Sequence, residues 1–256
     1  MKLKIDTVGA GPDLVMLHGW ALHCGLFDGI AGALAKTFRV HCIDLPGHGH
    51  NAHIELPANI DAAAGLVLDA APRDAHWLGW SFGGTVALAA ASLVPERVRK
   101  LLLVASTPRF TVSGDWPHAV AEANLNRMAA DLETDFRRTV DNFLALQVLG
   151  DERAVTLLRD LREKVFAHGE PAAASLASGL RILHDTDLRS RLSGIRAPLL
   201  AIMGGRDRLT PAAAGEALAD SVPGGRCVTI AKAAHMPFVS HREEFLELTE
   251  TFLGQD

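Results

Sequence analysis

The sequence feature that most restricts the fold is a serine flanked by glycines between two apolar runs. Gly79-Trp80-Ser81-Phe82-Gly83-Gly84 follows the run 75–78 and precedes the alanine-rich run 85–93. This order indicates a strand that enters a helix through a tight turn, where Gly79 and Gly83 avoid clashes and the residue between them is strained. The pattern predicts that Ser81 presents its hydroxyl as a nucleophile, although the same pattern also occurs in ordinary strand-to-helix turns.

Further apolar runs have the length and composition of strands buried on both faces. Helical candidates separate them, and this alternation predicts an α/β fold with a mostly parallel, doubly wound sheet. Ligands bind to such sheets outside the carboxyl ends of the strands. The strand runs are 14–17, 40–43, 101–104, 198–203 and 226–230, with edge-like alternation in 1–6, and the helical candidates are 26–38, 60–71, 84–93, 212–219 and 242–253.

The segment from Pro108 to about Leu188 has a different pattern. Its apolar residues recur every three or four positions, as in 125, 128, 132, 136, 140 and 143, and no buried-strand run interrupts them. This spacing is typical of amphipathic helices. The sequence therefore predicts a core formed by residues 1–107 and 189–256, with a helical lid inserted at 108–188.

A serine nucleophile needs a base to take its proton and an acid to orient that base. The order nucleophile, acid, histidine accompanies this type of turn. Ser81, Asp207 and His235 follow that order, and each comes directly after an apolar run. We expect these three residues to form a catalytic triad, with backbone N–H groups of Trp20 and Phe82 as the oxyanion hole.

The chain contains other residues of the types that these roles require. The chain has 12 histidines, of which His18 is expected to support its own loop and His48 and His50 to belong to a Pro-Gly turn. Asp185 and Asp187 are alternatives to Asp207, but they lie near the end of the lid and are expected to be solvated.

Composition limits the class of protein. A formal net charge of −5 disfavours nucleic-acid binding, which requires a basic surface. The three cysteines are scattered and form no ligand cluster, so no metal or cofactor is expected, and reduced thiols in the cytoplasm are predicted. No run approaches the roughly 18 apolar residues of a membrane span. Without a heptad pattern, a monomer is expected.

The sequence resembles the α/β-hydrolase superfamily along nearly its whole length, and within it the carboxylesterases of biotin synthesis that cleave the methyl ester of pimeloyl-acyl-carrier protein. The most specific motifs are 77–81 (WLGWS), 143–147 (FLALQ) and 231–235 (AKAAH), whereas 17–20 (LHGW) and 44–47 (DLPG) are common in the superfamily; 104–108 (VASTP) and the continuation 236–238 (MPF) also match. Phe82 stands where leucine is common, but only its backbone N–H is needed.

The resemblance implies a serine esterase that releases methanol from this carrier-bound ester and also accepts small esters. It implies an acyl-chain site formed by Trp20, Ser81, Phe82, Phe143, Leu144, Ala145, Leu146, Gln147 and His235. Another small-molecule hydrolase of this fold, such as a general carboxylesterase, a lactonase or a carbon–carbon bond hydrolase, remains an alternative, as does a ligand-binding protein without turnover. A dehalogenase is disfavoured because it would need a carboxylate at Ser81.

Lid arginines contact the acidic carrier protein in this family. Arg138 and Arg159 match that pattern, and Arg153 and Arg162 are additional candidates, whereas Asn142 and Val155 stand where arginine is expected. The alternative is that these arginines belong to a solvated helix face of mixed charge.

Overall fold

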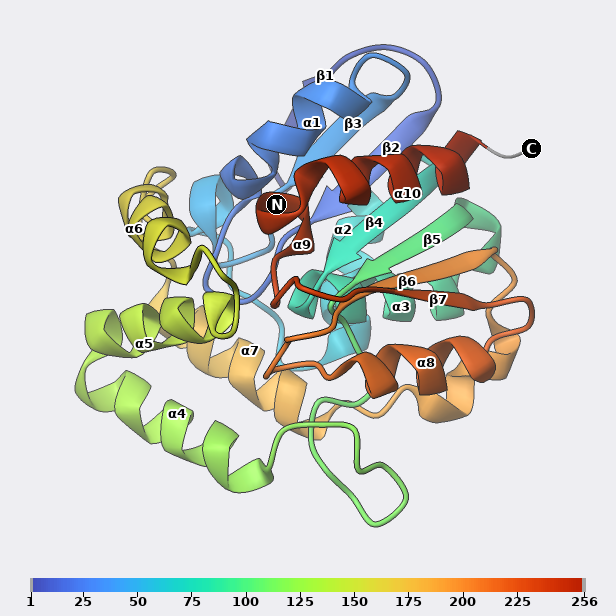
Figure 1. Ribbon diagram of the computed structural model, residues 1–256. Helices are drawn as coiled ribbons and strands as arrows, with labels where there is room; N and C mark the ends of the chain where they lie inside the picture. Colours follow the sequence, from blue (N-terminus) through green and yellow to red (C-terminus); the bar gives the residue numbers. More distant parts are fainter. Residues whose placement is uncertain (1, 255–256) are drawn as a thin grey trace.

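The computed structural model describes residues 2–254 as a twisted sheet with helices on both faces and four further helices grouped at one side (Figure 1). The strands are β1 (Ile5–Val8), β2 (Asp13–Leu17), β3 (Arg39–Ile43), β4 (Ala75–Trp80), β5 (Val98–Val104), β6 (Leu199–Gly204) and β7 (Arg226–Ile230). The helices are α1 (Asp28–Leu34), α2 (Ile60–Ala70), α3 (Phe82–Leu93), α4 (Glu122–Thr134), α5 (Phe136–Val148), α6 (Ala154–Lys164), α7 (Ala173–Asp185), α8 (Ala212–Asp220), α9 (Pro237–Ser240) and α10 (Arg242–Gly254).

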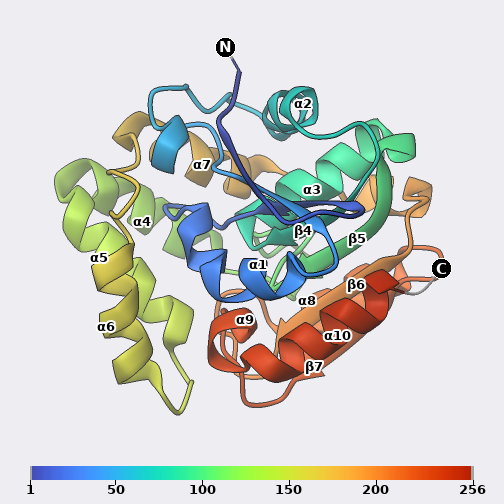
Figure 2. The same cartoon turned by 90° about the horizontal axis from the view of Figure 1, so that it is seen from above.

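The sheet has seven strands in the order β1-β3-β2-β4-β5-β6-β7. Only β1 is antiparallel to its neighbour, and the other pairs are parallel, so the predicted mostly parallel, doubly wound sheet is confirmed. The edge strand β1 begins at Ile5, later than the predicted 1–6, of which residue 1 lies outside the described residues. In the view from above, α1 and α10 lie on one face of the sheet and α2 and α3 on the other (Figure 2).

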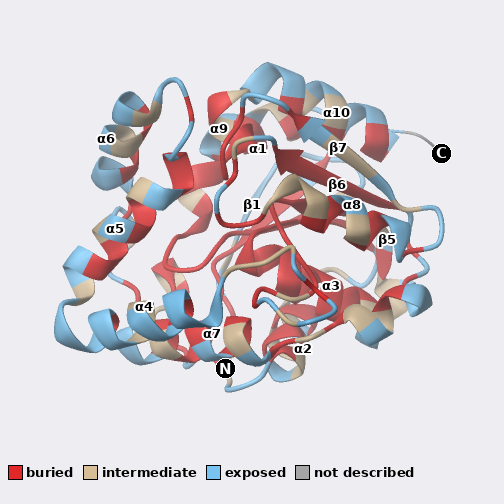
Figure 3. Ribbon diagram, turned by 60° about the horizontal axis from the view of Figure 1, so that its bottom comes forward, coloured by how far each residue is buried: buried red, intermediate tan, exposed pale blue. Residues whose placement is uncertain are grey.

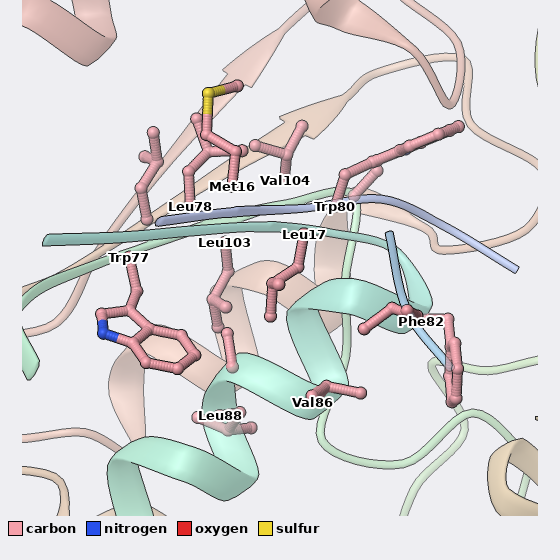
Figure 4. Close-up of a cluster of buried hydrophobic side chains, with 14 of the residues drawn as sticks. Met16, Leu17, Trp77, Leu78, Trp80, Phe82, Val86, Leu88, Leu103 and Val104 are labelled. Carbon is pink, nitrogen blue, oxygen red and sulfur yellow. The ribbon is translucent and has the colours of Figure 1, made fainter. Parts of the chain in front are cut away.

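The central strands are buried on both faces, as their continuous apolar runs predicted. Trp77 and Leu103 point toward α3, and Met16 and Leu78 point to the opposite face (Figure 4). All four side chains are completely buried. Because alternate residues of a strand face opposite sides, a strand with helices on both sides needs apolar residues at every position.

The predicted helix 26–38 differs in extent from that in the structure, and the helical periodicity of the inserted segment is divided between two helices. The candidate 26–38 is a short 3-10 turn, Cys24–Phe27, followed by α1, which ends at Leu34 because the chain must turn before β3 begins at Arg39. The apolar positions 125, 128 and 132 of the inserted segment belong to α4, and 136, 140 and 143 belong to α5. They separate at Asp135, whose carboxylate accepts a hydrogen bond from the backbone N–H of Arg138 and caps α5.

Helices α4 to α7 lie between β5 and β6 in the chain and beside the end of the sheet where β4 passes into α3 (Figure 1). Their inner faces are buried and their outer faces are exposed (Figure 3). Among residues 2–254, no helix combines the length and apolar character that a membrane crossing requires.

Candidate active site

Ser81 lies in the turn between β4 and α3, with φ of 53° and ψ of −120°. A non-glycine residue in this region is strained by roughly 1–3 kcal/mol. A Cβ on Gly83 would lie 2.4 Å from the carbonyl oxygens of Leu17 and His18, and a Cβ on Gly79 would lie 2.5 Å from the Gly83 carbonyl oxygen. The backbone of α3 therefore packs directly against β2, which holds the turn and keeps Ser81 in its strained conformation.

Asp207 and His235 are hydrogen-bonded, with 2.7 Å between Asp207 Oδ2 and His235 Nδ1. Both side chains are buried. Asp207 Oδ1 accepts hydrogen bonds from the N–H groups of Leu209 and Thr210, and Oδ2 accepts a third from the Thr210 hydroxyl. An ionised carboxylate only accepts, so the proton between Asp207 and His235 lies on Nδ1.

The opposite nitrogen of the His235 ring, Nε2, is buried and has no hydrogen-bond partner among the described residues. The backbone on either side of the ring is held, because the His235 N–H donates to the Gln147 carbonyl and the His235 carbonyl accepts from the Trp80 indole. The ring therefore has a defined orientation, and in the Nδ1–H tautomer its Nε2 is the nitrogen available as a base. Its bond to Ser81 Oγ is not formed here, and such bonds often tighten only when substrate binds.

The two N–H groups predicted for the oxyanion hole come from the same end of the sheet. Trp20 follows β2, and Phe82 is the first residue of α3. Within residues 2–254, neither backbone N–H donates to an acceptor of the protein. The Trp20 indole is used elsewhere, since it donates to the Leu176 carbonyl of α7.

A cavity of about 330 Å³ opens beside Ser81. Its buried wall is mostly apolar, and its exposed rim carries polar side chains. The buried wall includes Trp20, Phe110, Leu125, Phe143, Leu183 and Leu209, and the exposed rim includes Asn124, Arg127, Asp131, Asn142 and Arg208. Helices α4 and α5 supply much of both, so the cavity lies between the sheet and the inserted helices.

The structure separates the members of the predicted acyl-chain segment. Phe143 and Leu146 line the cavity, and the Phe143 ring packs edge-on against Trp20 at 4.8 Å between ring centroids. Leu144 is buried in the core, Ala145 is half-buried, and Gln147 is buried with its carboxamide unpaired among the described residues. These three do not line the cavity, because successive residues of a helix point in different directions.

The four predicted carrier-contact arginines are exposed on α5, on α6 and just before α6. Arg162 makes two hydrogen bonds to Asp141, and Arg159 pairs with the neighbouring Asp160. Arg138 and Arg153 have no ion-pair partner in the described part of the chain. The ion pairs of Arg162 and Arg159 agree with the alternative of a mixed-charge helix face.

A buried carboxylate, Asp44, organises the loops beside the site, and the sequence patterns did not single it out as a functional residue. It accepts hydrogen bonds from the backbone N–H groups of Cys24 and His50. Burial opposes its ionisation, but the His18 ring and these N–H groups together keep the pKa of Asp44 at about 2. The sequence shows that Asp44 follows the strand β3. It does not show that the Asp44 carboxylate bonds to the loop that contains Cys24.

His23, Asp44 and His168 have donor atoms within 4.8 Å of one another, the spacing of a potential metal site. Both nitrogens of His23 are engaged, with the Gly25 N–H and the Lys164 carbonyl. The His168 ring packs against the His23 ring at 4.1 Å between centroids, tilted by 30°, whereas rings that share a metal point their nitrogens at one centre. We therefore interpret this cluster as a contact between the α6–α7 connection and the core.

Comparisons with known proteins agree with this arrangement. The model of the Alpha/beta hydrolase family matches residues 14–248. A pimeloyl-[acyl-carrier protein] methyl ester esterase of Stenotrophomonas maltophilia (strain K279a) is 43% identical over 98% of this chain and 96% of its own. The enzyme of that name from Xanthomonas campestris pv. campestris (strain B100) is also 43% identical, over 98% and 99%.

Solved structures show the same fold. A hydrolase from Pseudomonas aeruginosa PA01 superposes with a TM-score of 0.85 at 28% identity, covering 98% of this chain and 94% of its own. The esterase EaEST from Exiguobacterium antarcticum superposes with a TM-score of 0.88 at 22% identity, covering 99% and 96%. The chain therefore belongs to the alpha/beta hydrolase family, and it is similar over almost its whole length to pimeloyl-[acyl-carrier protein] methyl ester esterases.

Proposed function

We propose that this protein is a serine carboxylesterase that hydrolyses the methyl ester of pimeloyl-acyl-carrier protein in biotin synthesis. The observation that carries the proposal is the 43% identity over 98% of the chain to esterases of that name. The 2.7 Å bond between Asp207 and His235, with Ser81 beside an apolar cavity, supports the esterase chemistry. The proposal requires no metal or cofactor.

In the proposed mechanism, His235 Nε2 takes the proton of the Ser81 hydroxyl while Oγ attacks the ester carbonyl. Asp207 holds His235 in the Nδ1–H tautomer and stabilises the imidazolium that forms. The N–H groups of Trp20 and Phe82 donate to the oxygen that becomes negative in the tetrahedral intermediate. His235 then protonates the leaving methoxide, and methanol departs from an acyl-enzyme on Ser81.

Water completes the cycle. His235 removes a proton from the water as its oxygen attacks the acyl carbonyl, and the returning proton releases Ser81. The product is a free carboxylate on an acyl chain whose other end is still joined to the carrier. The apolar wall of the cavity suits the methylene chain, and the polar rim suits the carrier-linked end, which must reach solvent.

We propose further that residues 108–188 act as a lid and that carrier protein docks on its exposed basic side chains. Arg138 and Arg153 are the strongest candidates because no carboxylate of the described chain competes for them. Arg159 and Arg162 would first have to exchange their present partners. The protein is proposed to act as a monomer in the cytoplasm.

Chemistry and substrate are tested separately. p-Nitrophenyl butyrate should be hydrolysed by the wild type, and Ser81→Ala should abolish both this turnover and labelling by a fluorophosphonate probe. Undiminished turnover by Ser81→Ala would refute the mechanism. Release of methanol from pimeloyl-acyl-carrier protein methyl ester, and growth of an esterase-deleted biotin auxotroph that expresses this chain, test the substrate.

Carrier docking is tested by comparing two substrates. Arg138→Ala combined with Arg153→Ala should raise KM for the carrier-bound ester and leave p-nitrophenyl butyrate kinetics unchanged. Arg99→Ala, in β5 and paired with Asp74, is a matched surface control. Equal KM for the carrier-bound ester in the double variant and the control would reject this docking surface.

A further inference from the structure

His18, the residue before the glycine that precedes Trp20, is completely buried and makes two hydrogen bonds. The backbone N–H of Leu45 donates to its Nε2 at 2.8 Å. A backbone N–H can only donate, so Nε2 is the acceptor and the ring proton lies on Nδ1. That proton is directed at the carbonyl oxygen of Gly19, 2.8 Å from Nδ1.

The Gly19 carbonyl belongs to the same peptide group as the Trp20 N–H. A trans peptide is planar, and its C=O and N–H point in opposite directions. A hydrogen bond that holds the Gly19 oxygen therefore also sets the direction of the Trp20 N–H. The same bond polarises the peptide, because consecutive hydrogen bonds strengthen one another.

We propose that His18 is a positioning residue that aims the Trp20 N–H at the oxyanion, through the carbonyl on the other side of that peptide. The inference rests on the proposed serine-esterase chemistry and goes beyond it, since it assigns a role to a histidine outside the triad. The Leu45 N–H hydrogen-bonds to the His18 ring, and the ring hydrogen-bonds to the Gly19 carbonyl, which shares its peptide group with the Trp20 N–H.

The second oxyanion donor is held in a different way. Phe82 N–H shares its peptide with the Ser81 carbonyl, which accepts from the Ser106 hydroxyl at 2.9 Å and from the N–H groups of Gly84 and Thr85 in the first turn of α3. Among residues 2–254, the Gly19 carbonyl has one other partner, the Leu22 N–H at 3.3 Å. The Trp20 peptide therefore depends on His18 more than the Phe82 peptide depends on Ser106.

The surroundings of His18 keep it neutral. Burial, followed by the neighbouring His48, lowers its pKa to about 3, with Asp44 opposing and His23 adding to the effect. A charged ring would carry a proton on Nε2 and repel the Leu45 N–H. His18 therefore serves as a fixed donor and acceptor rather than as an acid or base in the working pH range.

Two substitutions separate the bonds of His18. The Asn amide nitrogen can occupy the place of Nδ1 and donate to the Gly19 carbonyl, whereas the Gln amide oxygen can occupy the place of Nε2 and accept from Leu45. We expect His18→Gln to lower kcat for p-nitrophenyl butyrate by about 10- to 100-fold, part of the effect of deleting an oxyanion donor, with KM nearly unchanged. His18→Asn should recover most of the lost kcat.

Controls distinguish positioning from folding. Binding of a trifluoromethyl ketone, which forms a tetrahedral oxyanion on Ser81, should weaken in His18→Gln in proportion to kcat/KM. Ser106→Ala should have a much smaller effect, and His76→Asn, a buried histidine at the start of β4, should have none. Equal kcat for the Asn and Gln variants, or losses that follow Tm or appear only in KM, would overturn the inference.

A measurement on the wild type covers the case in which the variants do not fold. ¹⁵N NMR should show His18 as the Nδ1–H tautomer without titration between pH 5 and 9, and an Nε2–H tautomer would refute the arrangement.

The role of His18 and the identity of the substrate fail separately. If the carrier-bound ester is not hydrolysed but p-nitrophenyl butyrate is still cleaved through Ser81, only the proposed substrate is rejected.

Discussion

The orientation of the amide in an Asp207→Asn variant can be predicted from the hydrogen bonds of Asp207. Oδ1 accepts from two backbone N–H groups, those of Leu209 and Thr210, at 2.7 and 3.1 Å. An NH₂ group at that place would oppose two donors that cannot rotate away. The Asn oxygen must therefore take the place of Oδ1, and its NH₂ must take the place of Oδ2, 2.7 Å from His235 Nδ1.

An NH₂ group facing Nδ1 reverses the His235 tautomer. Nδ1 must now accept, so the ring proton moves to Nε2, the nitrogen that should take the Ser81 proton. A triad with its histidine in this tautomer loses about 10⁴-fold in kcat, which corresponds to about 5 kcal/mol at 1.36 kcal/mol per tenfold change. Stability should change little, because the amide is close in size to the carboxylate and keeps both backbone bonds.

The assay is kcat for p-nitrophenyl butyrate, with Tm measured on the same sample. Asp185→Asn is the control, because Asp185 is an exposed carboxylate and an alternative acid in the sequence. This substitution should leave kcat unchanged. ¹⁵N NMR of His235 reports the tautomer directly. A kcat for Asp207→Asn within about tenfold of the wild type, with a normal Tm, would refute the assigned role of Asp207.

Three further perturbations test the contact of α3 with β2, the buried histidines and the cavity wall. Gly83→Ala places a Cβ 2.4 Å from two backbone oxygens, and urea titration should show destabilisation by about 1–3 kcal/mol. The control Gly65→Ala places its Cβ in open space on α2 and should leave stability unchanged or raise it by up to about 1 kcal/mol. Equal effects of the two substitutions would contradict the close approach of α3 and β2. Burial lowers the pKa of His18 to about 3 and of His48 to about 4, so below pH 6.5 the unfolded chain binds more protons than the folded chain. The stability that both neutral rings contribute above pH 6.5 should therefore decrease as pH falls toward 4, by about 2–3 kcal/mol for each at pH 4.5. A flat free energy of unfolding between pH 7 and 4.5 would disagree with neutral rings. Phe143→Ala removes the edge contact with Trp20 and opens the cavity wall, and it should raise KM for long-chain p-nitrophenyl esters more than for the acetate; a uniform change would place the acyl chain elsewhere.

The sequence alone predicted the sheet, the turn at Ser81 and the order of the candidate triad. These features depend on local patterns, because a strand buried on both faces must be apolar throughout and a turn this tight excludes side chains around Ser81. Parallel strands in a doubly wound sheet end at one edge, so residues that directly follow them are brought together without knowledge of any single contact. Asp207 and His235 are such residues, and their 2.7 Å bond follows this rule.

Tertiary structure decided which side chains of the inserted helices reach the cavity and what the loop residues bond to. Phe143 and Leu146 line the cavity while Leu144 packs in the core, since the rotation of α5 is set by its neighbours and not by its own sequence. The pairing of Arg162 with Asp141 depends on how α6 lies against α5. The bonds from Leu45 through His18 to Gly19 join loops after two different strands, and the sequence placed His18 beside Trp20 without revealing which acceptor its proton would meet.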